Sequence, residues 1–485
     1  MRVKMEIVED LKNIDNKLIE ELNQIALNKI EYWDIRCSVS TGTSLDFTDQ
    51  KSKEVSSSEM IDCGIRGFIN GGWSFVVLKD LDRNSILSGF SKAVKLARLT
   101  ESLSKNKFKI KERDQLVKNF KVNSKKNLLD IDVEEKINLV KQHEKIMSNF
   151  SPKVINSRTL YVDYISHKLF INSFHSFINQ ELSGLRLYNL AYAQQKGSIQ
   201  GAVNSVGGIG GFEICETEKA TNLSKKTAKE SVMLLDAKSP VGGKFTVVMD
   251  PKLLGTVVHE AFGHAVEADI VLNKGSVLDE KIGHQIAVED VTIVDDPQMG
   301  QGKKFNLPHD LFGSYFIDSE WIPSQKTIVI ENGILKNYLH GLETSSRMNV
   351  TPNGHGRASS DSTRPQVRMG ITMLEPKDWN YEEIIEDTKE GILCEDFKYG
   401  YTDPSTGNFQ FKCKLSYKIK DGEKTELMRD VSLSGMILET LNKISAIGNT
   451  ISFSDGMCGK GGQSVRVCDG GPYIRIEDIL VGGLN

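Results

Sequence analysis

The chain of 485 residues lacks the features that mark several special classes of protein. It contains no run of 18 or more apolar residues, which argues against a membrane-spanning helix, and its first residues lack the apolar core of a signal peptide. Its seven cysteines are dispersed and form no CxxC pair. We therefore expect a cytoplasmic protein without a membrane partner, in which most cysteines are structural thiols.

The chain also has little net charge, with 61 Lys and Arg against 65 Asp and Glu. A formal charge of -4 argues against a broad nucleic-acid surface. The lysine-rich stretch 105–126 lacks interleaved aromatic residues, so we expect a solvated connection and no nucleic-acid partner. The composition, 39% hydrophobic and 26% charged, is that of an ordinary globular protein of two or three domains.

The N-terminal half has the periodicities of a mixed helix and strand unit. Predicted helices span 7–30, 82–99, 132–149 and 222–238; predicted strands span 32–39, 44–47, 64–69, 73–78 and several segments between 153 and 213. The glycines of 206–211 lack the spacing of a dinucleotide loop, and we expect a turn between strands there. A linker at 239–243 places the domain boundary near 215–243.

The C-terminal half reads as β-rich. Predicted strands span 244–249, 286–295 and 327–338, the last with a turn at Asn332-Gly333, and one helix is predicted at 381–388. We therefore expect an α+β fold of two domains: an N-terminal α+β domain, 1–230, and a β-rich domain, 240–485, that carries the candidate metal-binding helix.

That helix contains the most informative pattern in the chain. Asp250 and Pro251 are typical of a helix start, and the following residues place His259, Glu260 and His264 in an HExxxH arrangement. Zinc binds neutral imidazole nitrogens, and a catalytic site keeps one position for water that a neighbouring carboxylate can deprotonate. Glu260 has the residue type for that base.

The spacing of the two histidines is unusual. In the commoner HExxH pattern the imidazoles lie on one helix face, whereas residues five apart point about 140° away from each other on a regular helix. We therefore predict a π-type turn near Gly263, which would bring the two rings together. The alternative is two unrelated histidines on one helix.

A third ligand is required, and the residues alone leave its identity open. Cys458 stands in what reads as a glycine-rich turn near the C-terminus, while Glu267 and Asp269 follow His264 on what reads as the same helix. The two carboxylates are candidates either for the metal itself or for orienting a ligand from behind.

Several motifs in order along the chain resemble the TldD/PmbA family, specifically its metal-bearing TldD-type subunit. HEAFGHAVEAD is followed by CGKGGQ, GGPYIRI and a terminal VGG. The likeness extends over most of the chain through GIRGF at 64–68, IENGILKNYL at 330–339, TPNGHGR at 351–357 and IGN at 447–449.

The resemblance implies a zinc-dependent peptidase in which His259, His264 and Cys458 hold Zn2+ and Glu260 activates a metal-bound water. It further implies dimers, either homodimers or heterodimers with a metal-free TldE/PmbA-type partner, that enclose the sites in a chamber admitting unfolded or short peptides. Iron or cobalt would also suit this donor set.

Other residues and functions stay open at this stage. His340, His355 and Arg357 lie in a family-like stretch and are candidates for oxyanion or substrate contacts, against a purely loop-structuring role. Two alternative functions are a non-catalytic scaffold or regulatory member of the family and a zinc amidohydrolase acting on small molecules. An activity screen that compares unfolded peptides with small amides as substrates distinguishes these functions.

Overall fold

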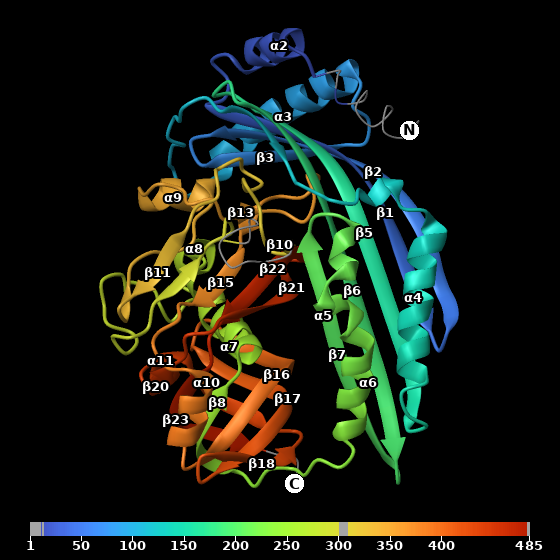
Figure 1. The fold of residues 1–485 in the computed structure, drawn as a ribbon. Helices are drawn as coiled ribbons and strands as arrows, with labels where there is room; N and C mark the ends of the chain where they lie inside the picture. Colours follow the sequence, from blue (N-terminus) through green and yellow to red (C-terminus); the bar gives the residue numbers. More distant parts are fainter. Residues whose placement is uncertain (1–10, 12–13, 300–308, 483–485) are drawn as a thin grey trace.

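The computed structural model describes residues 11, 14–299 and 309–482, and it confirms a mixed α and β protein with a strand-rich C-terminal region. Long antiparallel strands of the N-terminal half form a tall sheet, which the two-residue strand β10 of the C-terminal half joins at one edge (Figure 1). The order is β10-β7-β6-β5-β1-β2-β3, with β4 parallel to β6. Its strands are β1 (Tyr32–Thr48), β2 (Lys51–Ile69), β3 (Gly72–Leu78), β4 (Val117–Lys121), β5 (Val154–Asn172), β6 (Phe177–Gln195), β7 (Ser198–Ile209) and β10 (Asp310–Leu311).

These strands are longer than the sequence suggests. The strands predicted at 32–39 and 44–47 are one strand, β1, because the polar stretch between them stays paired with both β2 and β5. Gly42 permits this close pairing, since an added Cβ would lie 2.4 Å from the carbonyl oxygen of Asp163.

The 105–126 stretch contains β4 and is therefore not wholly a solvated connection. The turn expected at 206–211 is wrong, because its first four residues end β7.

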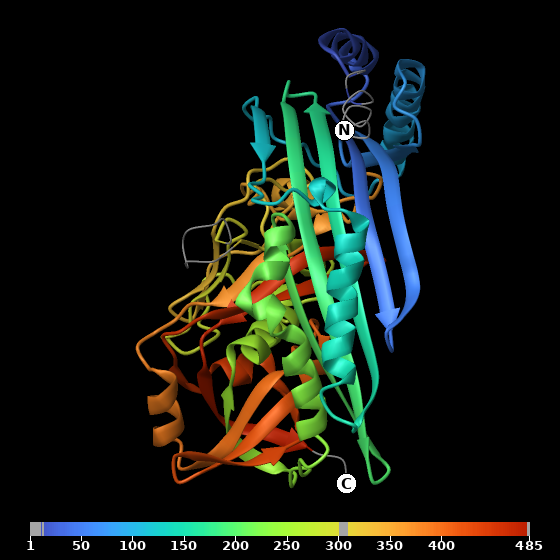
Figure 2. The ribbon, with the colours of Figure 1, turned by 45° about the vertical axis from the view of Figure 1, so that its right-hand side comes forward.

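Helices cover the top and one side of this sheet (Figures 1 and 2). Helix α3 packs on β2 and β3, α4 on β5, and α6 on β6 and β7. Asp15 and Asp82 cap α2 and α3 through their side chains, as acidic N-caps do. Of the predicted 7–30 helix, residues 7–10 and 12–13 lie outside the described residues, and α2 lies within the rest. The helices are α2 (Asn16–Ala26), α3 (Arg83–Leu103), α4 (Val133–Ser148), α5 (Glu218–Thr221) and α6 (Leu223–Met233), with short turns η1 (Leu128–Asp130) and η2 (Phe212–Glu216).

Two larger sheets form the C-terminal part. The first has the order β16-β8-β23-β19-β17-β18 with β20 paired to β23, and the second has the order β12-β11-β9-β15-β22-β21. The first contains β8 (Gly243–Met249), β16 (Glu390–Asp403), β17 (Asn408–Lys420), β18 (Glu423–Met428), β19 (Ser432–Met436), β20 (Ile444–Ile447) and β23 (Ile474–Gly482). The second contains β9 (Ile293–Asp295), β11 (Thr327–Glu331), β12 (Ile334–Leu335), β15 (Ile371–Leu374), β21 (Ser452–Lys460) and β22 (Gln463–Gly471).

Helix α7 lies between these two sheets (Figure 1), and the turns that follow it, Val258–Gly263 and His264–Val266, carry the metal-binding pattern. The 327–338 hairpin and the 381–388 helix are confirmed, but only the end of the predicted 286–295 strand is a strand. The expectation of one inserted helix is wrong, since further short helices follow the HExxxH segment: α8 (Ala268–Leu272), α9 (Leu342–Met348) and α11 (Ile437–Leu441). Helix α7 spans Pro251–Val257, α10 spans Tyr381–Asp387, and a small hairpin is formed by β13 (Gly356–Arg357) and β14 (Gln366–Val367).

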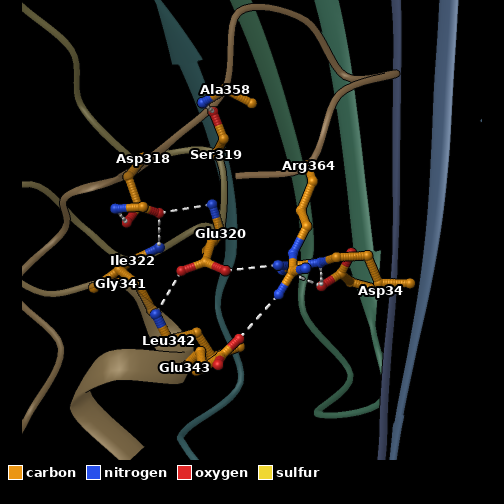
Figure 3. A network of polar contacts seen from close by, with 12 residues as sticks. Asp34, Asp318, Ser319, Glu320, Ile322, Gly341, Leu342, Glu343, Ala358 and Arg364 are labelled. Atoms are coloured by element: carbon orange, nitrogen blue, oxygen red, sulfur yellow. Dashed lines mark hydrogen bonds and ion pairs between the residues drawn. The ribbon is translucent and has the colours of Figure 1, made fainter. Parts of the chain in front are cut away.

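Buried ion pairs connect the N-terminal sheet to the C-terminal part. The guanidinium of Arg66 on β2 lies 2.5 Å from Asp34 on β1 and 2.6 Å from Glu320. The carboxylate of Glu320 also accepts a hydrogen bond from the backbone N–H of Leu342, as Figure 3 shows. Because each charge is buried and partnered, the network requires one relative placement of the two parts. In the described ranges, no helix has both the length and the apolarity needed to span a membrane.

Candidate metal centre

The HExxxH segment changes its helical geometry within a few residues. Asp250 accepts a hydrogen bond from the Leu253 N–H at 2.8 Å and so starts α7. The next turn, Val258–Gly263, is a π-helix, and a short 3-10 turn, His264–Val266, follows. The predicted π-type turn is therefore confirmed. It brings the rings of His259 and His264 to a centroid distance of 5.3 Å.

Gly263 ends this π turn under tight packing. A Cβ at this position would lie 2.0 Å from the sulfur of Met369. The buried Met369 side chain thus occupies the space that any other residue at 263 would need. The close approach of β15 and its preceding segment to the helix depends on this glycine.

Cys458 meets the two histidines across a separation of 194 residues from His264. One ligating atom from each of His259, His264 and Cys458 lies within 4.8 Å of the others. The Cys458 sulfur is 3.4 Å from Nε2 of His264. The sequence suggested a turn at Cys458, but this residue lies in strand β21. The turn follows at Gly461 and Gly462, both of which have positive φ.

The chemistry of this cluster fits a zinc-type cation. Both ring nitrogens of His259 are buried and have no partner with hydrogen-bond geometry in the part of the chain that the structure describes, although Nδ1 lies close to Asp469. Burial raises the pKa of the Cys458 thiol, but contacts with the two imidazoles lower it to about 5, so the thiolate forms at neutral pH. A thiolate and two imidazoles are donors that zinc binds readily.

Each of the two imidazoles has a carboxylate close to its Nδ1 atom. Oε2 of Glu267 lies 3.0 Å from Nδ1 of His264, and Oδ1 of Asp469 lies 2.7 Å from Nδ1 of His259. Both contacts lie at Nδ1 and leave Nε2 as the nitrogen for a ligand, and the contact with Glu267 also has hydrogen-bond geometry. Glu267 is not on the same helix as His264, because the chain leaves the helical conformation at its ψ of 115°. Asp269 instead contacts the ammonium of Lys460.

Sequence reasoning missed Asp469. The register of the β21–β22 hairpin indicates its position. Cys458 pairs with Val465, and the residues two and four positions after Val465 on β22 face the same side of the sheet as Val465. Asp469 therefore shares a face with the cysteine. Cys468, its neighbour, faces the other side, where it accepts a hydrogen bond from the Gly313 N–H and burial raises its pKa to about 12.

Glu260 stands beside the cluster at a cavity wall. Its Oε2 lies 3.8 Å from Nε2 of His264, and its side chain is 37% exposed. The adjacent cavity has a volume of about 510 Å³ and separates the N-terminal sheet from the metal helix. Residues lining it include Tyr188, Ser205, Thr256, His259, Glu260, Asp396, Met457 and Cys458. Glu260 is thus accessible, whereas the three candidate ligands are largely covered.

The other candidate residues lie away from this cavity as the described residues outline it. His355 is fully buried between Asp295 and Asn353, and His340 contacts Thr344. Arg357 donates to the carbonyl of Met369 and lines a second cavity of about 320 Å³. The structure therefore does not bring these three residues to the cluster of candidate ligands, His259, His264 and Cys458.

Comparison with known proteins agrees with these features. Three family models match the chain: PmbA/TldA metallopeptidase domain 1 at residues 33–97, the central domain at 126–235 and the C-terminal domain at 242–483. A protein named metalloprotease from Methanothermobacter thermautotrophicus is 37% identical over 456 residues, which cover 94% of this chain and 96% of that protein.

More distant proteins extend the comparison. A zinc metalloprotease TldD homolog from Saccharolobus solfataricus is 29% identical over 354 residues, covering 72% of this chain and 76% of that protein. The crystal structure of TldE from Thermococcus kodakarensis has the same fold, with a TM-score of 0.74 at 15% identity over 96% of this chain and 100% of that one. From the extent of these matches, the chain belongs to the PmbA/TldD family of metallopeptidases.

Proposed function

We propose that this protein is a zinc-dependent peptidase of the TldD type that hydrolyses peptide bonds in unfolded or short peptides. One observation carries the proposal: His259, His264 and Cys458 converge within 4.8 Å beside a cavity that Glu260 also lines. A ligand set and an accessible carboxylate are the two parts that metal-assisted hydrolysis needs.

In this proposal His259, His264 and Cys458 hold the zinc ion. When bound, zinc polarises the scissile carbonyl and lowers the pKa of water at the site. Glu260 accepts a proton from the attacking water and later delivers it to the leaving amine. Asp469 and Glu267 keep the two imidazoles in the tautomer that leaves Nε2 free, through their contacts with Nδ1.

The strand edges around the cavity support an extended peptide as the substrate. Strand β21, which carries Cys458, ends its sheet, and among the described residues β7 pairs on its outer side with β10 only at Gly208 and Ile209. Both strands contribute lining residues to the cavity. A peptide that adds to such an edge is bound through its main chain, which gives little selection by side chain.

We further propose a dimeric cytoplasmic enzyme. The fold shared with TldE supports assembly either as a homodimer or with a metal-free partner of that type. The seven cysteines are free thiols, which supports a reducing compartment. Light scattering on the purified chain, alone and with a TldE-type protein, distinguishes the two assemblies.

Metal content and cleavage together test the function. Plasma mass spectrometry on the purified protein is expected to give nearly one zinc per chain, lost in both Cys458→Ala and His264→Ala. Unfolded peptides are expected to be cleaved and small amides to be spared. Cleavage of small amides alone would favour an amidohydrolase, and a chain that binds no metal and cleaves neither substrate would favour a scaffold.

A further inference from the structure

Lys460 has no role in the proposed chemistry, although it stands only two residues after Cys458. Its Nζ lies 3.0 Å from Oε2 of Glu267, 2.8 and 2.9 Å from the two carboxylate oxygens of Asp269, and 3.0 Å from the carbonyl oxygen of Val367. An ammonium has three hydrogens to donate. With four oxygens this close, Lys460 is fully engaged within the protein.

The contact with Glu267 reaches the metal cluster directly. The same oxygen, Oε2, also lies 3.0 Å from Nδ1 of His264. The Glu267 side chain is fully buried, and its other oxygen has no hydrogen-bond partner within 11, 14–299 and 309–482. Lys460 and His264 are therefore the two contacts that determine which way the Glu267 carboxylate faces.

Lys460 also joins the two segments that supply the ligands. Residues two apart on a strand face the same side, so Lys460 and Cys458 project from β21 in one direction. Glu267 and Asp269 belong to the segment that leaves the metal helix after His264. Lys460 thus links the strand of the thiol to the segment that orients the imidazole.

Without the ammonium this arrangement would hold two carboxylates together with no cation between them. Glu267 is fully buried and the Asp269 side chain is 29% exposed. Like charges at low exposure repel, and a buried carboxylate that loses its partner is strongly unfavourable. The simplest relief is a rotation of Glu267 or a separation of β21 from the helix, and either change moves a ligand.

We propose that Lys460 is a positioning residue that holds Glu267 against His264 and fastens β21 to the metal helix, so that the three donors are assembled before a metal arrives. The inference rests on the metal site of the proposed function. Lys460 itself touches neither metal nor substrate. Its replacement therefore acts on metal affinity through Glu267.

The test measures zinc affinity by competition with a chromogenic chelator, which needs no peptide substrate. Lys460→Met is expected to weaken zinc binding about 10- to 100-fold, the range seen when partners of ligands are removed. Lys460→Arg keeps a cation and is expected to recover part of the loss. Lys443→Met is the matched control, since Lys443 pairs with Asp478 on the surface, with Nζ 3.2 Å from Oδ2.

A double-variant cycle separates positioning from general damage. Glu267→Gln is expected to weaken zinc binding by a similar factor, and the Lys460→Met, Glu267→Gln pair to weaken it no further, because the two residues act as one unit. Circular dichroism of the metal-free chains checks folding, and Lys460→Gln carries the same expectation if Lys460→Met does not fold.

The outcomes are distinct. Affinity within two-fold of the unmodified chain in Lys460→Met, or losses that add fully in the double variant, overturns the positioning role. If the unmodified chain binds zinc and Lys460→Met binds it more weakly, the positioning role is supported, whether or not peptide cleavage is found. An unmodified chain that binds no zinc overturns the proposed metal site, and the inference with it.

Discussion

Nδ1 of His259 lies 2.7 Å from Oδ1 of Asp469, a contact that joins the metal helix to strand β22. Both side chains are largely covered, with exposures of 2% and 11%. The contact sets the ring so that its Nε2 is left for a ligand, as Glu267 does for His264. The two imidazoles of the cluster therefore each have their own carboxylate.

Replacing Asp469 tests this arrangement. Asp469→Asn keeps the size of the side chain but removes the charge, and we expect zinc affinity to fall about 10- to 100-fold. Chelator competition measures the change. Asp478→Asn, at a surface aspartate that is 48% exposed, is the control and is expected to bind zinc normally. Equal affinity in the two variants would remove Asp469 from the site.

Glu260→Gln separates metal binding from catalysis. The substitution removes a base but no proposed ligand, so zinc content is expected to stay unchanged while peptide cleavage falls about 10²- to 10⁴-fold. Metal analysis and a fluorescent peptide assay check the two halves. Glu280→Gln, at a glutamate that is 84% exposed, should cleave normally. Cleavage that survives in Glu260→Gln would assign the base to another residue.

Removal of the metal is expected to lower stability as well as activity. A ligand that binds only the folded state at 100 times its Kd stabilises that state by about 2.7 kcal/mol. Thermal unfolding should therefore shift downward after chelation and return when zinc is added. The Cys458→Ala variant should unfold at the same temperature in both conditions. A zinc-dependent shift of similar size in that variant contradicts the three-donor site.

Gly255→Ala tests the packing of the metal helix on β22. An added Cβ would lie 2.6 Å from the backbone nitrogen of Gly470 and 2.7 Å from the carbonyl carbon of Asp469, neither of which can move alone. We expect a loss of about 1 to 3 kcal/mol in stability and weaker zinc binding. Gly242→Ala, whose added Cβ would approach only a carbonyl oxygen at 3.7 Å, is the control.

The stability of the chain should depend on pH through His143. Burial lowers the pKa of this histidine from 6.5 to about 4, because the charged form is disfavoured away from water. The unfolded chain thus takes a proton as the pH falls below about 6.5, while the folded chain does not until about 4. Stability is therefore full above that interval and decreases through it as the pH falls, by about 3 kcal/mol.

Unfolding measured at pH 7 and pH 4.5 checks this dependence. In His143→Gln the decrease between the two pH values should be smaller by about the same amount, since glutamine does not titrate. His143 contacts Ser224 and Asn189 in the packing between α4, β6 and α6, far from the metal residues in sequence. An identical decrease in the two proteins would show that His143 does not titrate as its burial implies.

Local patterns were enough to predict the start of the metal helix and its π turn. The first followed from Asp250 and Pro251, and the second from the five-residue spacing of His259 and His264. Cys458 was singled out only through the family resemblance, since no local pattern connects it to a helix 194 residues away. Its role as a ligand stays a prediction.

Contacts that depend on tertiary packing were out of reach. Asp469 and Lys460 reach the histidine side of the site only because the β21–β22 hairpin packs against α7 in one register. The continuous strand β1 was missed for a related reason: its middle, with Ser40, Gly42 and Thr43, is too polar for the alternation that marks a half-buried strand. Pairing with neighbours on both sides keeps it extended.

The distance in sequence between the histidines and Cys458 has a consequence for biosynthesis. A ribosome makes the helix with its two imidazoles long before it makes β21 and β22, so a nascent or truncated chain has no closed set of donors. The hairpin that brings the thiolate also brings Asp469 and Lys460. Under the proposed function, peptide cleavage would thus begin only once synthesis has passed this hairpin.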